Sequence, residues 1–200
     1  MCRACRRGEP AISRSLLPVR AAEFLTLTFD IENRPLSYWI PDRPTAEITA
    51  IAWSFGGLIE VVLLGRDDPR WMLERFSEAY AAANMVTGHY IRKHDLPIIN
   101  GALMEYGMPG LTPKLTHDTK LDMVKKADIP ATQEFLCEML DISLPKVHMT
   151  QANWREANRL TTIGLEKTFA RVTGDVAQHM LLRPAMIAAG WLKAPRVWRP

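Results

Sequence analysis

A strict alternation of apolar and polar residues marks the first strand that the chain predicts. In EFLTLTFDIE (residues 23–32), apolar side chains occupy every second position from Leu25 to Ile31, and most positions between them are polar. Successive side chains of a strand point to opposite faces, so this pattern predicts a half-buried β-strand. Two acids, Asp30 and Glu32, therefore share the polar face near the end of this strand.

A pair of strands is predicted next along the chain. The apolar segments EITAIAWSF (residues 47–55) and LIEVVLL (residues 58–64) flank Gly56 and Gly57. Two glycines between apolar runs are typical of a hairpin with a two-residue turn. Together with the first strand, this hairpin predicts a three-strand meander.

The segment DDPRWMLERFSEAYAAAN (residues 67–84) predicts the first helix. Asp68 is a suitable N-cap, and Pro69 fits the first helical position, where no backbone N–H is needed. The apolar residues recur at helical spacing and predict the buried face: Met72, Leu73, Phe76, Tyr80 and Ala83.

Strand and helix then alternate. The segment NMVTGHYIRKHDLPIING (residues 84–101) predicts a short strand ending near Gly88, a loop, and a helix that begins at Asp95–Pro97. The segment KLTHDTKLDMVKKA (residues 114–127) predicts another strand that runs into a helix, with its N-cap at residue 118 or 119.

The last third of the chain is predicted to be helical. Residues 164–192 follow a mostly helical pattern, with interruptions at Gly174 and Pro184. Strands first, then alternating strand and helix, predict an α/β fold with a mixed sheet and helices on its faces.

Composition favours one domain with a basic leader. With 200 residues and 48% hydrophobic content, residues 21–200 can bury one sizeable core. Residues 1–20 carry five arginines against one glutamate, which fits either a disordered, solvated leader, a misplaced start codon or a contact to nucleic acid phosphates. Cys2 and Cys5 form half a zinc motif at most, and with Cys137 they are too few for a disulfide framework.

The chain also lacks the usual signals for a membrane or for export. No uninterrupted apolar run reaches about 18 residues, and the Arg-rich start has no apolar centre. We therefore expect a cytoplasmic protein with no membrane partner.

The acid pair is the first candidate for chemistry. Asp30 and Glu32 repel each other unless a proton or a cation neutralises them, and carboxylate oxygens suit Mg²⁺ or Mn²⁺. Acids at strand ends are also common without any ligand, so the pair alone does not decide between the two interpretations.

Three segments together resemble a known family. They are TFDIEN (residues 28–33), TGHYIRKHDLPIING (residues 87–101) and FARVTGDVAQHMLL (residues 169–182). In this order they resemble the three motifs of the DEDD (DnaQ-like) 3′-5′ exonuclease superfamily. The resemblance spans residues 24–182 and implies an RNase H-like fold: a mixed sheet of a three-strand meander followed by parallel strands, with helices on both faces.

The resemblance also implies a site and an activity. It assigns the metal-ligand role to Asp30, Glu32, Asp95 and Asp175, and the HDT at residues 117–119 resembles a segment between the second and third motifs. Two Mg²⁺ or Mn²⁺ ions would then support hydrolysis of phosphodiester bonds at single-stranded or frayed 3′ ends of nucleic acid. A polymerase is an implied partner.

The chain departs from the family pattern at the general base. Tyr90 and His94 replace the usual Asn and Phe of the second motif, while Arg171 and Ala170 stand where the two branches of the family have Tyr or His. Arginine cannot act as a base because its pKa exceeds about 12. Three alternatives follow: the metals alone activate the water while Arg171 stabilises phosphate charge, His179 relays the proton, or the enzyme is weak.

Other functions stay open at this point. An exoribonuclease or an RNase H-like endonuclease would use a similar acid cluster, and a catalytically degenerate nucleic-acid-binding module would explain the missing base. Such a module would not need all four acids at matching motif positions, so we expect an active exonuclease, suited to phage or bacterial replication or repair. The choice between DNA and RNA depends on contacts to the 2′-oxygen, which these motifs do not reveal.

Overall fold

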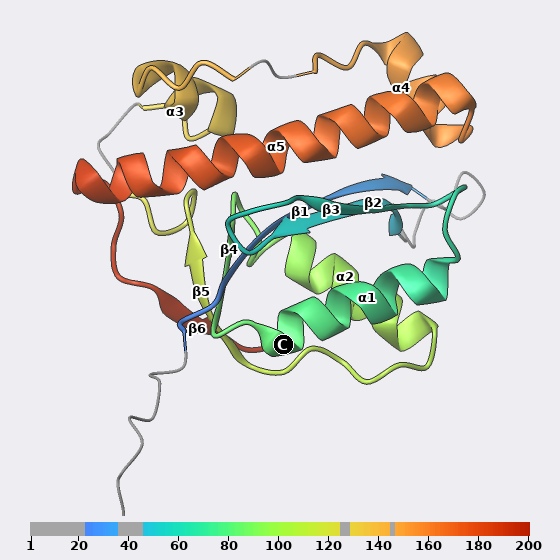
Figure 1. Cartoon of the computed structure of the whole chain (residues 1–200), viewed down its shortest axis with the longest axis horizontal. Coiled ribbons are helices and arrows are strands. Elements are labelled where there is room, and N and C mark those ends of the chain that lie inside the picture. The colour runs from blue at the N-terminus through green and yellow to red at the C-terminus, as the bar shows by residue number, and fades with distance from the viewer. Residues whose placement is uncertain (1–22, 36–45, 125–128, 145–146) are drawn as a thin grey trace, which may run out of the picture.

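A mixed β-sheet lies at the centre of the computed structural model, which describes residues 23–35, 46–124, 129–144 and 147–200 (Figure 1). Within these residues the sheet has six strands in the order β3-β2-β1-β4-β5-β6. They are β1 (Thr26–Pro35), β2 (Ala46–Ser54), β3 (Glu60–Leu63), β4 (Met85–Gly88), β5 (Lys114–Asp118) and β6 (Arg196–Trp198). β1 runs antiparallel to β2 and parallel to β4, β4 runs parallel to β5, and β6 is antiparallel to β5.

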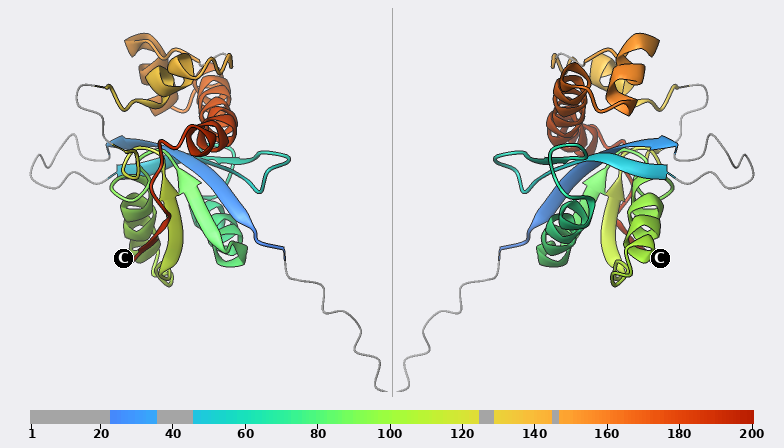
Figure 2. Two further views of the ribbon diagram at one scale, coloured as in Figure 1. Left: turned by 90° about the vertical axis from the view of Figure 1, so that its left-hand side faces the viewer. Right: turned by 90° about the vertical axis from the view of Figure 1, so that its right-hand side faces the viewer.

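Helices cover both faces of this sheet. They are α1 (Pro69–Ala82), α2 (Asp95–Glu105), α3 (Gln133–Met139), α4 (Gln151–Asn158) and α5 (Thr162–Ala188). Figure 2 shows α5, with α3 and α4 outside it, on one side of the sheet and α1 and α2 on the other. The predicted α/β class, with a meander, parallel strands and helices on both faces, is confirmed. None of the helices in the described residues is both long and apolar enough to cross a bilayer.

The alternation in β1 separates two environments. Leu27, Phe29 and Ile31 are buried in the main core, together with side chains of α1 and α2. Asp30 and Glu32 alternate with them and therefore point to the opposite face, where α5 packs. The sequence pattern thus predicted correctly which side of the sheet carries the acids.

The first helix follows its prediction closely. Asp68 is the N-cap of α1, and its side chain accepts a hydrogen bond from the backbone N–H of Trp71 at 3.0 Å. All five apolar residues predicted for its buried face are buried: Met72, Leu73, Phe76, Tyr80 and Ala83. The cap and the apolar stripe fix the start and the orientation of the helix.

The turn between β2 and β3 is longer than the two residues predicted. β2 ends at Ser54 and β3 begins at Glu60, so residues 55–59 form the connection. The Ser54 hydroxyl accepts from the Gly56 N–H at 3.0 Å and donates to the Gly57 carbonyl at 3.2 Å. These two bonds satisfy the backbone of the loop in place of a tight hairpin turn.

α5 continues through both residues predicted to interrupt it. Val172 and Val176 on either side of Gly174, and Leu182 and Met186 on either side of Pro184, are fully buried. This packing outweighs the weak helix propensity of glycine and the lost hydrogen bond of proline.

Two other element predictions were wrong in the described residues. Residues 119–124 form a turn and an isolated bridge, not a helix, while residues 125–127 of that prediction lie outside the described residues. The last third is not wholly helical, because β6 returns the chain to the sheet edge beside β5. The predicted leader, residues 1–20, also lies outside the described residues, so the division of the chain at residue 21 stays a prediction.

Candidate metal centre

Small residues in β2 let α5 approach the acids of β1. Asp30 pairs with Ala52 and Glu32 with Ala50 across the two strands, and both alanines are fully buried. They pack against α5 in a small apolar cluster. Because no large side chain separates the helix from the sheet here, Asp175 of α5 can reach the acids of β1.

Three of the four predicted metal ligands converge. One carboxylate oxygen from each of Asp30, Glu32 and Asp175 lies within 4.8 Å of the other two. Asp175 is buried, whereas Asp30 and Glu32 are half-buried. Among the described residues this group could hold a metal ion, since its donors are all carboxylate oxygens, the ligands that hard divalent cations prefer.

The fourth predicted ligand, Asp95, lies beside this group and is not one of its members. It is the first residue of α2 and is buried. Its Oδ1 accepts from the backbone N–H of Ile31 at 3.3 Å, and its Oδ2 lies 3.4 Å from His94 Nδ1. The backbone bond joins the start of α2 to β1 between Asp30 and Glu32.

The electrostatics of the site are those of crowded carboxylates. Burial raises the pKa of Asp30 well above its usual value, and the charges of Asp95, Asp175 and Glu32 raise it further, in that order. Arg171 acts in the opposite direction but does not cancel these effects. A cation bound at the acids would remove the repulsion, which is the behaviour expected of a metal site.

His94 is a residue of the site that the sequence did not single out as functional. The pKa of Asp95 is raised by burial, against the lowering effect of the hydrogen bond and charge of His94. The pKa of His94 is raised in turn, chiefly by its hydrogen bond to Asp95. His94 thus holds the Asp95 carboxylate on the side away from Ile31.

Arg171 pairs with two of the acids. It lies one helical turn before Asp175 on α5, and its Nε is 2.8 Å from Asp175 Oδ2 and 3.3 Å from Glu32 Oε1. Its Nη1 donates to the backbone carbonyl of Val147 at 3.2 Å. The guanidinium is therefore part of the acid cluster. From the sequence, Arg171 was assigned to the site only because it stands where one branch of the family has its general base.

His179 is not brought to the acids. It is buried, and its Nε2 lies 2.9 Å from the Thr87 hydroxyl of β4. That hydroxyl donates to the His117 carbonyl at 2.6 Å, so Nε2 of His179 must be the donor, and Nδ1 has no hydrogen-bond partner in the described part of the chain. Burial lowers the pKa of His179 to about 3, with smaller contributions from His89, Arg183 and His117.

A close backbone approach places the loop that leads to Asp95. Gly88 ends β4, and a Cβ at this position would lie 2.7 Å from the carbonyl oxygen of Phe29 and would overlap the side chain of Ile91. The loop can pass this close to β1 because residue 88 has no side chain.

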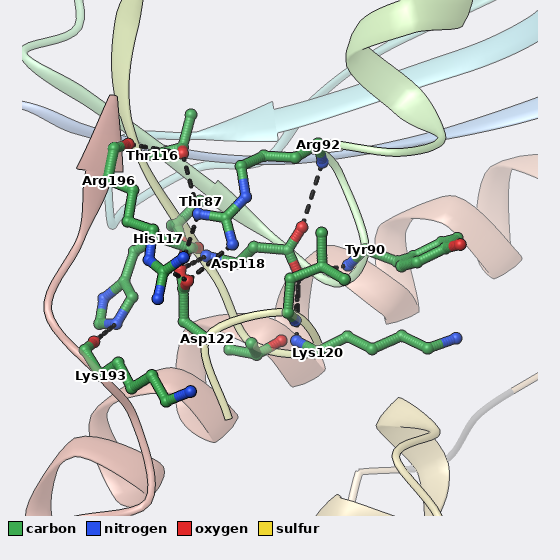
Figure 3. Close-up of polar contacts among 12 residues, drawn as sticks. Thr87, Tyr90, Arg92, Thr116, His117, Asp118, Lys120, Asp122, Lys193 and Arg196 are labelled. Atoms are coloured by element: carbon green, nitrogen blue, oxygen red, sulfur yellow. Dashed lines mark hydrogen bonds and ion pairs between the residues drawn. The ribbon is translucent and has the colours of Figure 1, made fainter. Parts of the chain in front are cut away.

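A buried polar network then holds the same loop (Figure 3). The carboxylate of Asp118, fully buried at the end of β5, accepts from the backbone N–H groups of Tyr90 and Arg92 at 3.0 and 3.1 Å. It also accepts from the N–H groups of Lys120 and Leu121 at 3.0 and 2.9 Å. From the sequence, Asp118 was a candidate helix cap and part of the HDT segment, and in the structure it joins two loops.

Asp122 completes the network. It is fully buried, and it forms a two-pronged ion pair with the guanidinium of Arg92 at 2.6 and 3.0 Å. It also accepts from the Asp118 N–H at 2.9 Å and lies 3.6 Å from Arg196 Nε of β6. The spacing of Asp118 and Asp122 in the sequence gives no sign of these partners, which come from the loop between β4 and α2 and from β6.

Comparisons with known proteins support the fold. Neither a protein-family model nor a curated protein sequence matches the chain. Among solved structures, the chain is similar to the family B DNA polymerase from the hyperthermophilic archaeon Pyrobaculum calidifontis, with a TM-score of 0.61 and 18% sequence identity. The match covers 82% of this chain and 25% of the polymerase chain, so the protein spans about a quarter of the length of that polymerase. This similarity is consistent with the expected RNase H-like fold.

Proposed function

We propose that this protein is a metal-dependent 3′-5′ exonuclease of the DEDD type that hydrolyses phosphodiester bonds in DNA. The observation that carries this proposal is the convergence of Asp30, Glu32 and Asp175 from β1 and α5, with Asp95 beside them. The similarity of the fold to a DNA polymerase supports a function on nucleic acid.

The residues fit divalent cations. The donors are all carboxylate oxygens, and the raised pKa of Asp30 indicates negative charge that Arg171 does not fully neutralise. Asp30, Glu32, Asp95 and Asp175 would hold Mg²⁺ or Mn²⁺. When bound, such ions neutralise phosphate charge and lower the pKa of the attacking water.

The protein's own residues position this chemistry. The backbone bond from Ile31 and the contact with His94 fix Asp95 at the start of α2. Arg171 orients Glu32 and Asp175, and its guanidinium would also contact the substrate phosphate. In the described residues, His179 contacts Thr87 and none of the acids, which argues against a proton relay through it. The cations would therefore activate the water.

We further propose single-stranded or frayed 3′ ends as substrate and replication or repair inside the cell as the setting, with a polymerase as partner.

One observation favours a second candidate function. Because Arg171 pairs with Glu32 and Asp175, the site resembles one in which a side chain has replaced a metal. A catalytically degenerate nucleic-acid-binding module is the alternative that this geometry supports.

The deciding experiment is a nuclease assay on matched substrates. Single-stranded DNA and RNA of the same sequence, labelled at the 5′ end, are incubated with the protein in Mg²⁺, Mn²⁺ or EDTA. We expect a ladder that shortens from the 3′ end of DNA only when a divalent cation is present, and loss of the ladder in Asp30→Asn.

The controls separate the alternatives. Glu78→Gln, an exposed acid on α1, should retain the activity. Degradation of RNA alone would indicate an exoribonuclease, and internal cleavage would indicate an endonuclease. Binding without cleavage in any metal would support the degenerate module.

A further inference from the structure

Arg171 places a positive charge beside two carboxylates of the acid cluster, those of Glu32 and Asp175. We propose that Arg171 takes the place of one of the two divalent cations expected of a DEDD site, so that this protein binds a single Mg²⁺ or Mn²⁺ ion. The inference rests on the proposed function, because it concerns the same carboxylates.

Arg171 and a cation would compete for the same oxygens. Its Nε lies 2.8 Å from Asp175 Oδ2 and 3.3 Å from Glu32 Oε1. A divalent ion shared by these oxygens would lie about 2.1 to 2.6 Å from each, so the guanidinium would have to leave.

The structure also holds Arg171 in place. Its Nη1 donates to the Val147 carbonyl at 3.2 Å, and its side chain is only 22% exposed. Its neighbour Val172 is fully buried against the sheet, which fixes this turn of α5. Displacement of the guanidinium would break two ion pairs and a backbone hydrogen bond in a poorly solvated position, where the loss is costly.

The other half of the cluster, Asp30 and Asp95, has no arginine or lysine partner in the described part of the chain, and Asp95 is contacted by His94 alone among the histidines there. Among the described residues, no ion pair joins Arg171 to Asp30 or Asp95. Asp95 lies next to Asp30 along the sheet, because its Oδ1 accepts from the Ile31 N–H, between Asp30 and Glu32. The single divalent cation should therefore be held chiefly by Asp30 and Asp95, with the oxygens of Glu32 and Asp175 that Arg171 Nε does not pair with as its remaining ligands.

The test is a count of bound Mn²⁺. The purified protein is titrated with Mn²⁺, and free ion is measured by electron paramagnetic resonance. We expect one tight site per chain in the wild type and two in Arg171→Gln. Arg171→Lys, which keeps a positive charge, should bind one, as should the control Arg70→Gln, whose exposed side chain lies on α1.

The outcomes distinguish this inference from the proposed function. Two tight ions in the wild type, or one in Arg171→Gln, would overturn the inference. Arg171→Met replaces Arg171→Gln if circular dichroism shows that the latter is unfolded. One tight ion in the wild type and two in the variant, without nuclease activity in any protein, would keep the inference and reject the exonuclease. No bound ion in the wild type would reject both.

Discussion

Asp30 is a residue whose ionised form destabilises the folded protein. Its carboxylate loses solvent on folding and lies beside three other acids, so the folded state favours its protonated form. A group whose pKa is raised on folding stabilises the protein below its unfolded pKa of about 4 and loses that contribution as the pH rises. Near neutral pH the metal-free protein is therefore destabilised by its own acids.

Replacement of Asp30 should separate stability from activity. Asp30→Asn removes one of the crowded charges, so in EDTA we expect a higher melting temperature than in the wild type, and no nuclease activity with metal. The stability difference should be small at about pH 4 and grow toward about pH 8. Thermal unfolding across this range measures it. A difference that does not change with pH would contradict the assignment of the effect to repulsion.

His179 should give the opposite pH dependence. Burial lowers its pKa to about 3, and protonation would also place an N–H at Nδ1, which has no hydrogen-bond partner in the described residues. A group whose pKa is lowered on folding stabilises the protein above its unfolded pKa of about 6.5. That contribution is lost as the pH falls toward the pKa of the folded state.

The test is a comparison of acid unfolding. Between about pH 6 and pH 4, the unfolding free energy of the wild type should fall more steeply than that of His179→Gln, by up to about 1.4 kcal/mol per pH unit. His148→Gln, an exposed control, should follow the wild type. Equal slopes in all three proteins would show that His179 is not buried in the neutral form.

His179→Gln also tests the proton relay in a nuclease assay, since loss of a general base costs about 10² to 10⁴ in rate.

At the scale of elements, the loop between β4 and α2 depends on β5. Asp118 accepts four backbone hydrogen bonds, two of them from the loop that ends at Asp95. Tyr90 in this loop has a φ of 69°, which is unfavourable for a residue with a large side chain. The bond from its N–H to Asp118 helps to hold that conformation.

Loss of this carboxylate should therefore reach the metal site. Asp118→Ala leaves four part-buried N–H groups without this partner, at a cost of about 1 to 3 kcal/mol for each group that water does not reach. We expect a lower denaturation midpoint and a weaker affinity for Mn²⁺, because Asp95 would lose its fixed position. Urea unfolding and Mn²⁺ titration measure the two effects. Glu138→Ala, at an exposed position of α3, is the control. An unchanged Mn²⁺ affinity in a destabilised Asp118→Ala would show that the network stabilises the fold alone.

The elements also show which features the sequence could predict. The alternation in β1, the cap of α1 and the end of β4 are local patterns, and all three were predicted correctly. The continuity of α5 through Pro184, the short strand β6 and the turn after Asp118 depend on packing with distant residues, which no local pattern carries. The approach of Arg171 to Glu32 is of the same kind, because it requires the small alanines of β2 on the sheet beneath α5.

At the scale of the whole molecule, the acids connect its layers. Asp30 and Glu32 belong to the sheet, Asp95 to a helix on one face, and Asp175 to the helix on the other face. A cation bound to acids from all three layers would link them only in the folded state. Metal binding should therefore stabilise the whole fold as well as the site.

The last prediction follows from this linkage. A ligand that binds only the native state adds about 2.7 kcal/mol to the unfolding free energy at a concentration of 100 times its dissociation constant. We expect Mn²⁺ to raise the melting temperature of the wild type in a concentration-dependent way, and EDTA to reverse the increase. Asp175→Asn should respond much less, because it loses the ligand that joins α5 to the sheet, whereas Glu78→Gln should respond like the wild type.

Amide hydrogen exchange locates the same effect in the fold. It should be slower in β1, in the first turn of α2 and around Asp175 when Mn²⁺ is added. Protection confined to β1 would mean that the cation does not join the layers, and an equal increase in melting temperature for Asp175→Asn would place the metal elsewhere.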